Sequence, residues 1–103
     1  MDLITQTLAR ELGRGEEQIA NVIRLIDEGN TIPFIARYRK ELHGSMDDQL
    51  LRQLADRLQY LRNLAARKEE VKSSIQSQDK LTEELSAAID AAATLAEVED
   101  LYR

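Results

Sequence analysis

The chain has 103 residues, of which 43% are hydrophobic and 32% charged, with a net charge of −5 and no cysteine. This composition is typical of one folded domain, because disordered chains hold far fewer aliphatic side chains. The lack of cysteine excludes disulfide scaffolds, thiolate nucleophiles and cysteine-ligated zinc or iron–sulfur sites. No apolar run approaches the ~18 residues of a membrane span, and the first residues lack a signal-peptide pattern. We therefore expect a cytoplasmic protein without membrane contact.

The charge is unevenly distributed. Residues 1–30 hold 3 basic and 6 acidic side chains, residues 31–78 hold 9 and 6, and residues 79–103 hold 2 and 7. A dedicated nucleic-acid clamp usually has a basic excess, which the whole chain lacks. The basic side chains nevertheless concentrate in the middle, first at Arg37, Arg39 and Lys40 and then at Arg67 and Lys68.

Two short amphipathic helices are predicted before residue 30. Asp2 can cap the first helix, and Gly13 and Gly29 can end the first and second by adopting positive φ. Apolar residues recur between these signals with helical spacing, at Ile4, Leu8 and Leu12 and at Ile19, Val22, Ile23 and Ile26. The pair predicts a helical hairpin like the opening of a helix-turn-helix.

A third, short helix is predicted to begin near Pro33, which suits a first helical turn, and to end at Gly44. Phe34, Ile35 and Tyr38 are expected to be its buried anchors, with the basic cluster pointing elsewhere. His43 has no cysteine or histidine partner, so we expect a surface turn residue and no metal ligand.

A long helix is predicted from about residue 45 to Ser77, capped by Ser45 or Asp47, because no glycine or proline follows Gly44. Leucines form a core-facing stripe in its first part, whereas Lys68 and Lys72 interrupt the stripe later, where we expect the helix to leave the local core. Two shorter helices should follow, one from Thr82 and one opened by a Thr94–Glu97 capping box.

The predicted long helix would measure ~46 Å, whereas a compact chain of this size is a sphere of roughly 33 Å. We therefore expect an elongated all-α domain whose far end packs on something outside the sequence. The long helix could alternatively pair with the same helix of a second copy of the chain and form a homodimer.

The sequence contains no phosphate-binding glycine loop, nucleophile elbow or His-Glu-x-x-His motif, which predicts no enzymatic activity, no cofactor and no metal. The basic residues allow two interpretations. Arg37, Arg39 and Lys40, extended by Arg67 and Lys68, can contact nucleic-acid phosphates, with Tyr38 as a stacking surface. Alternatively, the arginines can dock on carboxylates of a neighbouring helix or domain.

The run from Asp27 to Glu41, DEGNTIPFIARYRKE, closely resembles the signature of the Tex family of bacterial transcription accessory proteins. The similarity continues to the last residues and includes Asp48, Leu51-Arg52, Tyr60-Leu61, Arg67-Lys68-Glu69, Ser74-Ile75, Lys80-Leu81-Thr82 and Glu99-Asp100-Leu101-Tyr102. Asp79 stands where the family usually has glycine, and Arg103 where it usually has leucine.

The resemblance implies a longer polypeptide in which residues 1–103 form the N-terminal helical domain, and it carries over no catalytic residue. Further helices, a non-catalytic ribonuclease-H-like domain, helix-hairpin-helix elements and a C-terminal OB-fold RNA-binding domain would follow. Within residues 1–103 we expect short helices over 1–44, the long helix over 45–78 and terminal helices over 79–103. The implied function is a scaffold or interaction domain that binds the remainder of the polypeptide, while other domains bind most of the nucleic acid. The alternative is direct, salt-dependent binding of RNA or DNA by this domain.

Overall fold

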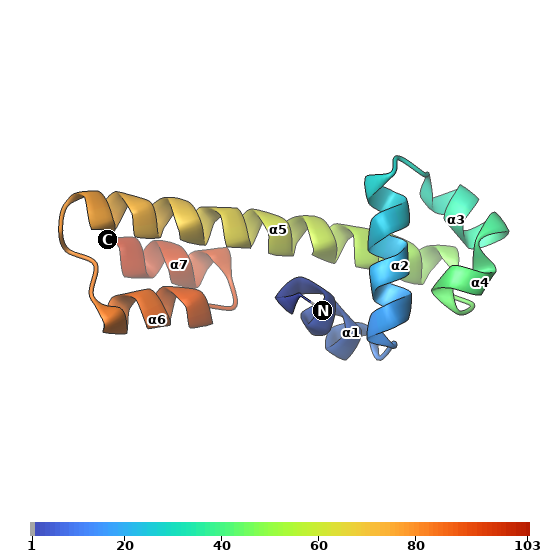
Figure 1. Ribbon diagram of the computed structural model, residues 1–103, viewed down its shortest axis with the longest axis horizontal. Coiled ribbons are helices and arrows are strands. Elements are labelled where there is room, and N and C mark those ends of the chain that lie inside the picture. The colour runs from blue at the N-terminus through green and yellow to red at the C-terminus, as the bar shows by residue number, and fades with distance from the viewer. Residues whose placement is uncertain (1) are drawn as a thin grey trace. The chain divides into compact units, whose positions relative to one another are not determined.

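The computed structural model describes residues 2–103, and within them every regular element is a helix (Figure 1). The chain divides into two compact units, one up to Tyr60 and one over Leu61–Arg103. The helices are α1 (Leu3–Leu12), α2 (Glu16–Asp27), α3 (Ile32–Tyr38), α4 (Lys40–His43), α5 (Asp48–Ser77), α6 (Glu83–Ala91) and α7 (Leu95–Tyr102). The predicted all-α class and the long helix are confirmed.

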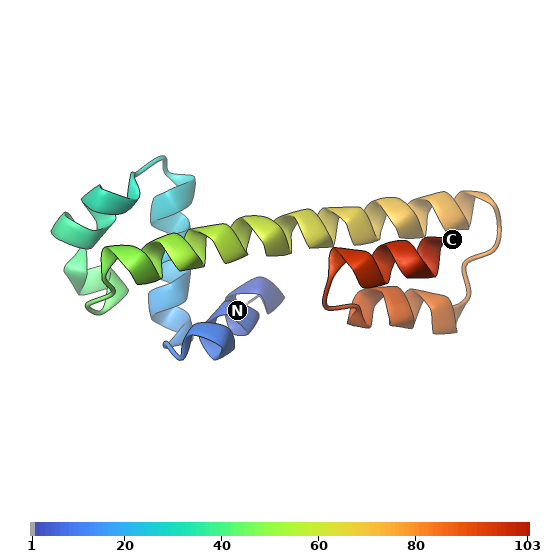
Figure 2. The same ribbon diagram turned by 180° about the vertical axis from the view of Figure 1, so that it is seen from behind.

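The first unit begins with the predicted helical hairpin of α1 and α2. The Asp2 carboxylate accepts a hydrogen bond of 2.8 Å from the Thr5 N–H and so caps α1. Gly13 (φ 68°) and Gly29 (φ 93°) adopt the left-handed conformation that ends α1 and α2. α2 contacts α1, α3 and α4, and the first part of α5 completes the unit (Figure 2). Its buried apolar side chains come from α1, α2, α3, the turn before α5 and the first part of α5, and include Leu8, Ile19, Val22, Ile35, Met46, Leu51 and Leu54.

The single helix expected between Pro33 and Gly44 is broken into two. Arg39 (φ −123°, ψ 37°) leaves the helical conformation between α3 and α4, and Gly44 (φ 65°) ends α4. The expectation that His43 lies on the surface is wrong, because its side chain is 0% exposed. The His43 Nδ1 accepts a 2.9 Å hydrogen bond from the Met46 N–H and so holds the turn into α5.

Helix α5 has 30 residues and begins after Asp47, whose carboxylate accepts a 2.8 Å hydrogen bond from the Leu50 N–H. Its second half leaves the core of the first unit, as expected, and lies in the second unit. Val71 and Ile75 are buried in a second core with Ile89, Ala92 and Val98 of the following segment. Helices α6 and α7 contact each other, and both views show α7 alongside this half of α5 (Figures 1 and 2). This half of α5 is therefore covered by helices of the same chain.

Lys68 and Lys72 interrupt the apolar stripe without ending the burial of α5. The Lys68 Nζ donates to the Asp90 carbonyl at 2.8 Å, and the Lys72 Nζ lies 2.9 Å from the Asp90 carboxylate. A lysine stem can cover apolar surface while its ammonium group reaches a polar partner at the edge. Both lysines thus secure the end of α6 to α5.

The helix ends of the second unit follow the predicted capping signals, with one difference. Thr82 and Thr94 cap α6 and α7 by accepting hydrogen bonds from Leu85 and Glu97 N–H groups. The Glu97 carboxylate, however, accepts from the Ala93 N–H at 3.0 Å instead of the Thr94 N–H. Among residues 2–103, none of the helices combines the length and apolar character that a membrane crossing needs.

Candidate interaction surface

Ile35 is the fully buried side chain of α3, while Ile32 and Ala36 are half-buried. Ile35 is 0% exposed, while Thr31 caps the helix by accepting a 3.3 Å hydrogen bond from the Phe34 N–H. Pro33 lies in the first turn, where its missing N–H needs no partner. A helix held in this way presents its remaining face outward.

Two aromatic rings lie on that outward face. Phe34 is 42% exposed and Tyr38 is 57% exposed, and their ring centroids are 5.2 Å apart with the planes tilted by 44°. The expectation that both rings anchor the helix in the core is therefore wrong; Ile35 alone of the three does so. Residues four apart share a helix face, so Phe34 and Tyr38 are exposed together once Ile35 faces the core.

One member of the predicted basic cluster contacts these rings. The Arg37 guanidinium lies over the Tyr38 ring, 5.2 Å from its centroid, which is a cation–π contact. Lys40 is exposed at the start of α4, and among residues 2–103 its ammonium group has no hydrogen bond or ion pair. Arg39 is half-buried at the break, with its Nε 3.8 Å from the Glu41 carboxylate. Arg37 is therefore the predicted cation that contacts the exposed rings, while Arg39 and Lys40 follow at the break between α3 and α4.

Arg67 and Lys68, the other two predicted site residues, lie in the second unit and are engaged there. Arg67 donates from Nε and Nη2 to the two Glu99 carboxylate oxygens, at 2.6 and 3.0 Å, and from Nη1 to Glu70 at 2.8 Å. Lys68 donates to Asp90, as described above. These contacts join helices of the second unit, so the two residues serve its internal packing.

The Arg67–Glu99 pair changes the acidity of both groups. Hydrogen bonds from Arg67 lower the pKa of Glu99, and hydrogen bonds to Glu99 and Glu70 raise the pKa of Arg67. In the first unit, Arg57 of α5 donates from Nε and Nη2 to Glu11 of α1, at 2.9 and 2.7 Å. That contact likewise lowers the pKa of Glu11. Both pairs favour the charged forms and hold α5 to a neighbouring helix.

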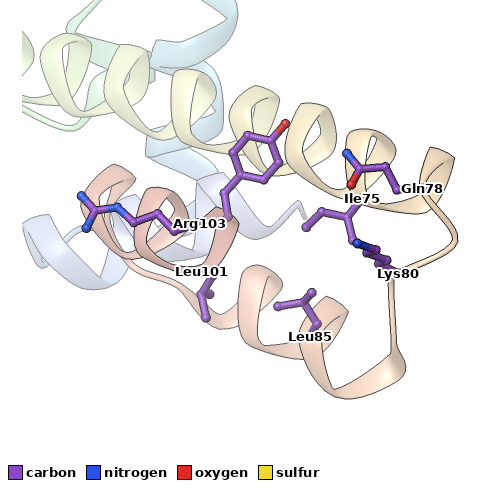
Figure 3. Close-up of a pocket in the computed structure, with 7 residues that line it drawn as sticks. Ile75, Gln78, Lys80, Leu85, Leu101 and Arg103 are labelled. Carbon is purple, nitrogen blue, oxygen red and sulfur yellow. The ribbon is translucent and has the colours of Figure 1, made fainter.

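A pocket of about 450 Å³ opens at the end of the second unit (Figure 3). Its lining consists of aliphatic, amide, phenol and basic side chains, namely Ile75, Gln78, Lys80, Leu85, Leu101, Tyr102 and Arg103. Figure 3 shows Leu85 and Leu101 between α6 and α7. Among the residues that the structure describes, no three histidine, cysteine, aspartate or glutamate side chains group into a metal site. Compared with this pocket, the exposed rings of α3 and the nearby cations Arg37 and Lys40, which have no ion pair among the described residues, form the more distinctive surface.

Sequence reasoning identified the cations of this surface but not the exposure of its rings. One sequence feature does indicate that Tyr38 is exposed. It lies between Arg37 and Arg39 at a predicted helix end, and a ring flanked by two arginines is an unusual core residue.

Comparison with known proteins identifies the family to which this chain belongs. The model of the Tex-like protein N-terminal domain matches residues 2–76, which include all of α1 to α4 and almost all of α5. This chain belongs to the Tex family. The α3 surface therefore lies inside the region that the Tex-like domain model describes.

Relatives extend the Tex similarity over α6 and α7. The chain is 54% identical over 99 residues to the transcriptional accessory protein Tex of Neisseria gonorrhoeae, covering 96% of this chain and 13% of that protein. It is 48% identical over 101 residues to protein YhgF of Escherichia coli, covering 98% of this chain and 13% of that protein. A human relative, S1 RNA-binding domain-containing protein 1, is 40% identical over 80 residues, or 78% of this chain and 8% of that protein. The chain thus spans a small part of the length of these relatives.

Proposed function

We propose that this Tex-like domain is a non-enzymatic scaffold that docks on the remainder of a longer transcription accessory protein, while other domains bind most of the nucleic acid. The observation that carries the proposal is the exposed Phe34–Tyr38 pair, accompanied by Arg37 and Lys40 without carboxylate partners among the described residues. Aromatic and arginine side chains are enriched at the centres of protein interfaces. The chain spans only 13% of the length of each of these two relatives, which is consistent with a domain that has neighbours in the same polypeptide.

Hydrogen exchange tests this docking. We would compare amide exchange over residues 2–103 in the isolated chain and in the longer protein, with circular dichroism as the check that the isolated chain is helical. Docking predicts slower exchange of part of this region in the longer protein, because an interface excludes water and suppresses local opening. Identical exchange throughout residues 2–103 would contradict the proposal.

Direct binding of RNA or DNA is the second candidate, and the exposed cations Arg37 and Lys40 favour it. Binding to phosphates would weaken with salt, with a logarithmic slope of about −0.7 for each neutralised phosphate of a single strand. The test is a titration of the chain and of the longer protein with labelled RNA and DNA at two salt concentrations. Replacing Arg37, Arg39 and Lys40 together by alanine should then weaken binding and preserve helicity. Equal binding by this triple variant would exclude the cluster as a nucleic-acid site.

A further inference from the structure

Among residues 2–103, three arginines lie over tyrosine rings. Arg37 lies over Tyr38, with its Cζ 5.2 Å from the ring centroid. Arg57 lies over Tyr60 at 5.2 Å, and Arg67 lies over Tyr102 at 5.4 Å. Stacking on a ring restrains a guanidinium group and leaves its N–H edge free to bind an acceptor.

Two of these three arginines bind a carboxylate of another helix in the same way. Arg57 and Arg67 each use Nε and Nη2 to bind both oxygens of one glutamate, Glu11 of α1 for Arg57 and Glu99 of α7 for Arg67. Each set of arginine, tyrosine ring and glutamate is called here an arginine–tyrosine–carboxylate triad. Within each unit, a triad joins α5 to a helix that is distant in sequence.

The Arg37–Tyr38 pair lacks the third member of such a triad. Among residues 2–103, no carboxylate forms an ion pair with Arg37, although its ring contact has the same distance as that of Arg57. Lys40, exposed at the start of α4, also has no ion pair there. The pair thus offers a positive charge and a planar N–H edge without an acceptor.

The rings beside Arg37 indicate which other side chain a binding partner has close to its carboxylate. Phe34 and Tyr38 expose apolar ring surface next to the guanidinium, so a complementary partner has an apolar side chain close to its carboxylate. A helix supplies that combination when a glutamate and a leucine stand three or four positions apart.

A protein carboxylate fits this surface better than a nucleic-acid strand does. Bases stack on free ring faces, but Arg37 lies over one face of the Tyr38 ring, and Phe34 packs on the same ring at a tilt of 44°. A strand also needs several cations in a row, whereas the exposed cations at this position are Arg37 and Lys40, and Glu41 lies next to them.

We propose that Arg37 and Tyr38 are completed as a third arginine–tyrosine–carboxylate triad by an aspartate or glutamate on a helix of the remainder of the same polypeptide, with an apolar side chain of that helix covering Phe34. This inference rests on the proposed docking function and names its surface and the chemistry of its partner.

The test uses the longer protein and its Arg37→Glu variant. Reversing the charge at position 37 places a carboxylate opposite the partner's carboxylate. We expect amide exchange over α3 and α4 to become about tenfold faster or more, approaching the rate in the isolated chain. The matched control is Arg52→Glu, at an exposed arginine of α5, which should leave this exchange unchanged. Circular dichroism of the isolated Arg37→Glu chain checks that the first unit remains folded.

Carbodiimide cross-linking, which joins an amine directly to a carboxylate, identifies the partner. Lys40 of the longer protein should couple to an aspartate or glutamate beyond residue 103, and replacing that residue by arginine should restore slow exchange to the Arg37→Glu variant.

The outcomes separate this inference from the proposed function. If Arg37→Glu leaves exchange unchanged while residues elsewhere in 2–103 are protected in the longer protein, docking uses another surface and the inference fails alone. If no part of residues 2–103 is protected, both fail. If α3 is protected only when RNA is added, and Arg37→Glu abolishes that effect, the surface binds nucleic acid and the inference is overturned.

Discussion

At the scale of single residues, Asp79 has a backbone conformation that glycine adopts more easily than aspartate does. It follows α5 with a φ of 56°, in the left-handed region that glycine occupies more easily. The Lys80 N–H donates to the Ile75 carbonyl and the Asp79 N–H to the Gln76 carbonyl, at 3.2 and 2.9 Å, which together form a Schellman motif. The resemblance to Tex sequences, in which glycine is usual there, agrees with this geometry.

Replacing Asp79 by glycine should therefore stabilise the domain. We expect the free energy of unfolding to rise by about 0.5–1 kcal/mol, because the strain of a left-handed aspartate outweighs the greater freedom of glycine in the unfolded chain. Urea denaturation followed by circular dichroism measures the change. Gln76→Gly, within the last turn of α5, is the control and should lower the same quantity by a similar amount. Equal losses for both variants would contradict the role assigned to Asp79.

At the scale of elements, ion pairs attach helices to α5 in both units. Arg57–Glu11 attaches α1, and Arg67–Glu99 attaches α7. A depressed carboxyl pKa means that the folded state binds the proton more weakly than the unfolded state does. The contribution of Glu99 is therefore complete above its ordinary pKa of 4.5 and is lost as the pH falls through its lowered value.

This linkage predicts the pH dependence of a Glu99→Gln variant. The variant should be less stable than the original chain at pH 7, and the difference should shrink below pH 4.5 as Glu99 becomes protonated in the original chain. Urea denaturation at several pH values between about 2.5 and 7 measures it. Asp56→Asn, at an exposed position of α5, controls for the loss of one negative charge. A difference that is constant over this range would show that the ion pair is not its source.

At the scale of the whole molecule, residues 2–103 form two cores, and α5 contributes side chains to each of them. The first core gathers side chains from α1 to α3 and the start of α5, and the second gathers Val71 and Ile75 with residues of α6 and α7. Each unit has 60 residues or fewer. Units of that size bury a limited fraction of their surface, so their stability depends on every buried side chain.

A charge placed in the second core should unfold that unit selectively. Val71 is 0% exposed, and Val71→Asp would bury a carboxylate at a cost of several kcal/mol. Amide exchange should accelerate over residues 61–103 and remain slow in α1 and α2. Ser73→Asp, two residues further along at an exposed position, should leave the exchange unchanged. Equal acceleration in both units would show that they unfold as one.

The sequence by itself determined the helical class, the family and most helix ends. These features depend on local chemistry, since Asp2, Asp47, Thr82 and Thr94 cap helices with their own side chains and Gly13 and Gly29 end them through their own backbone freedom. Only the tertiary structure decided which face of each helix is buried. Tyr38 is exposed, His43 is buried and Lys72 borders a core, because each depends on helices that pack there from distant parts of the chain. Periodicity shows that a helix has an apolar face but does not identify the partner that covers it. For this reason the cations at positions 37, 39 and 40 were predicted as a cluster, whereas the exposed rings that distinguish this surface emerged from the packing of Ile35.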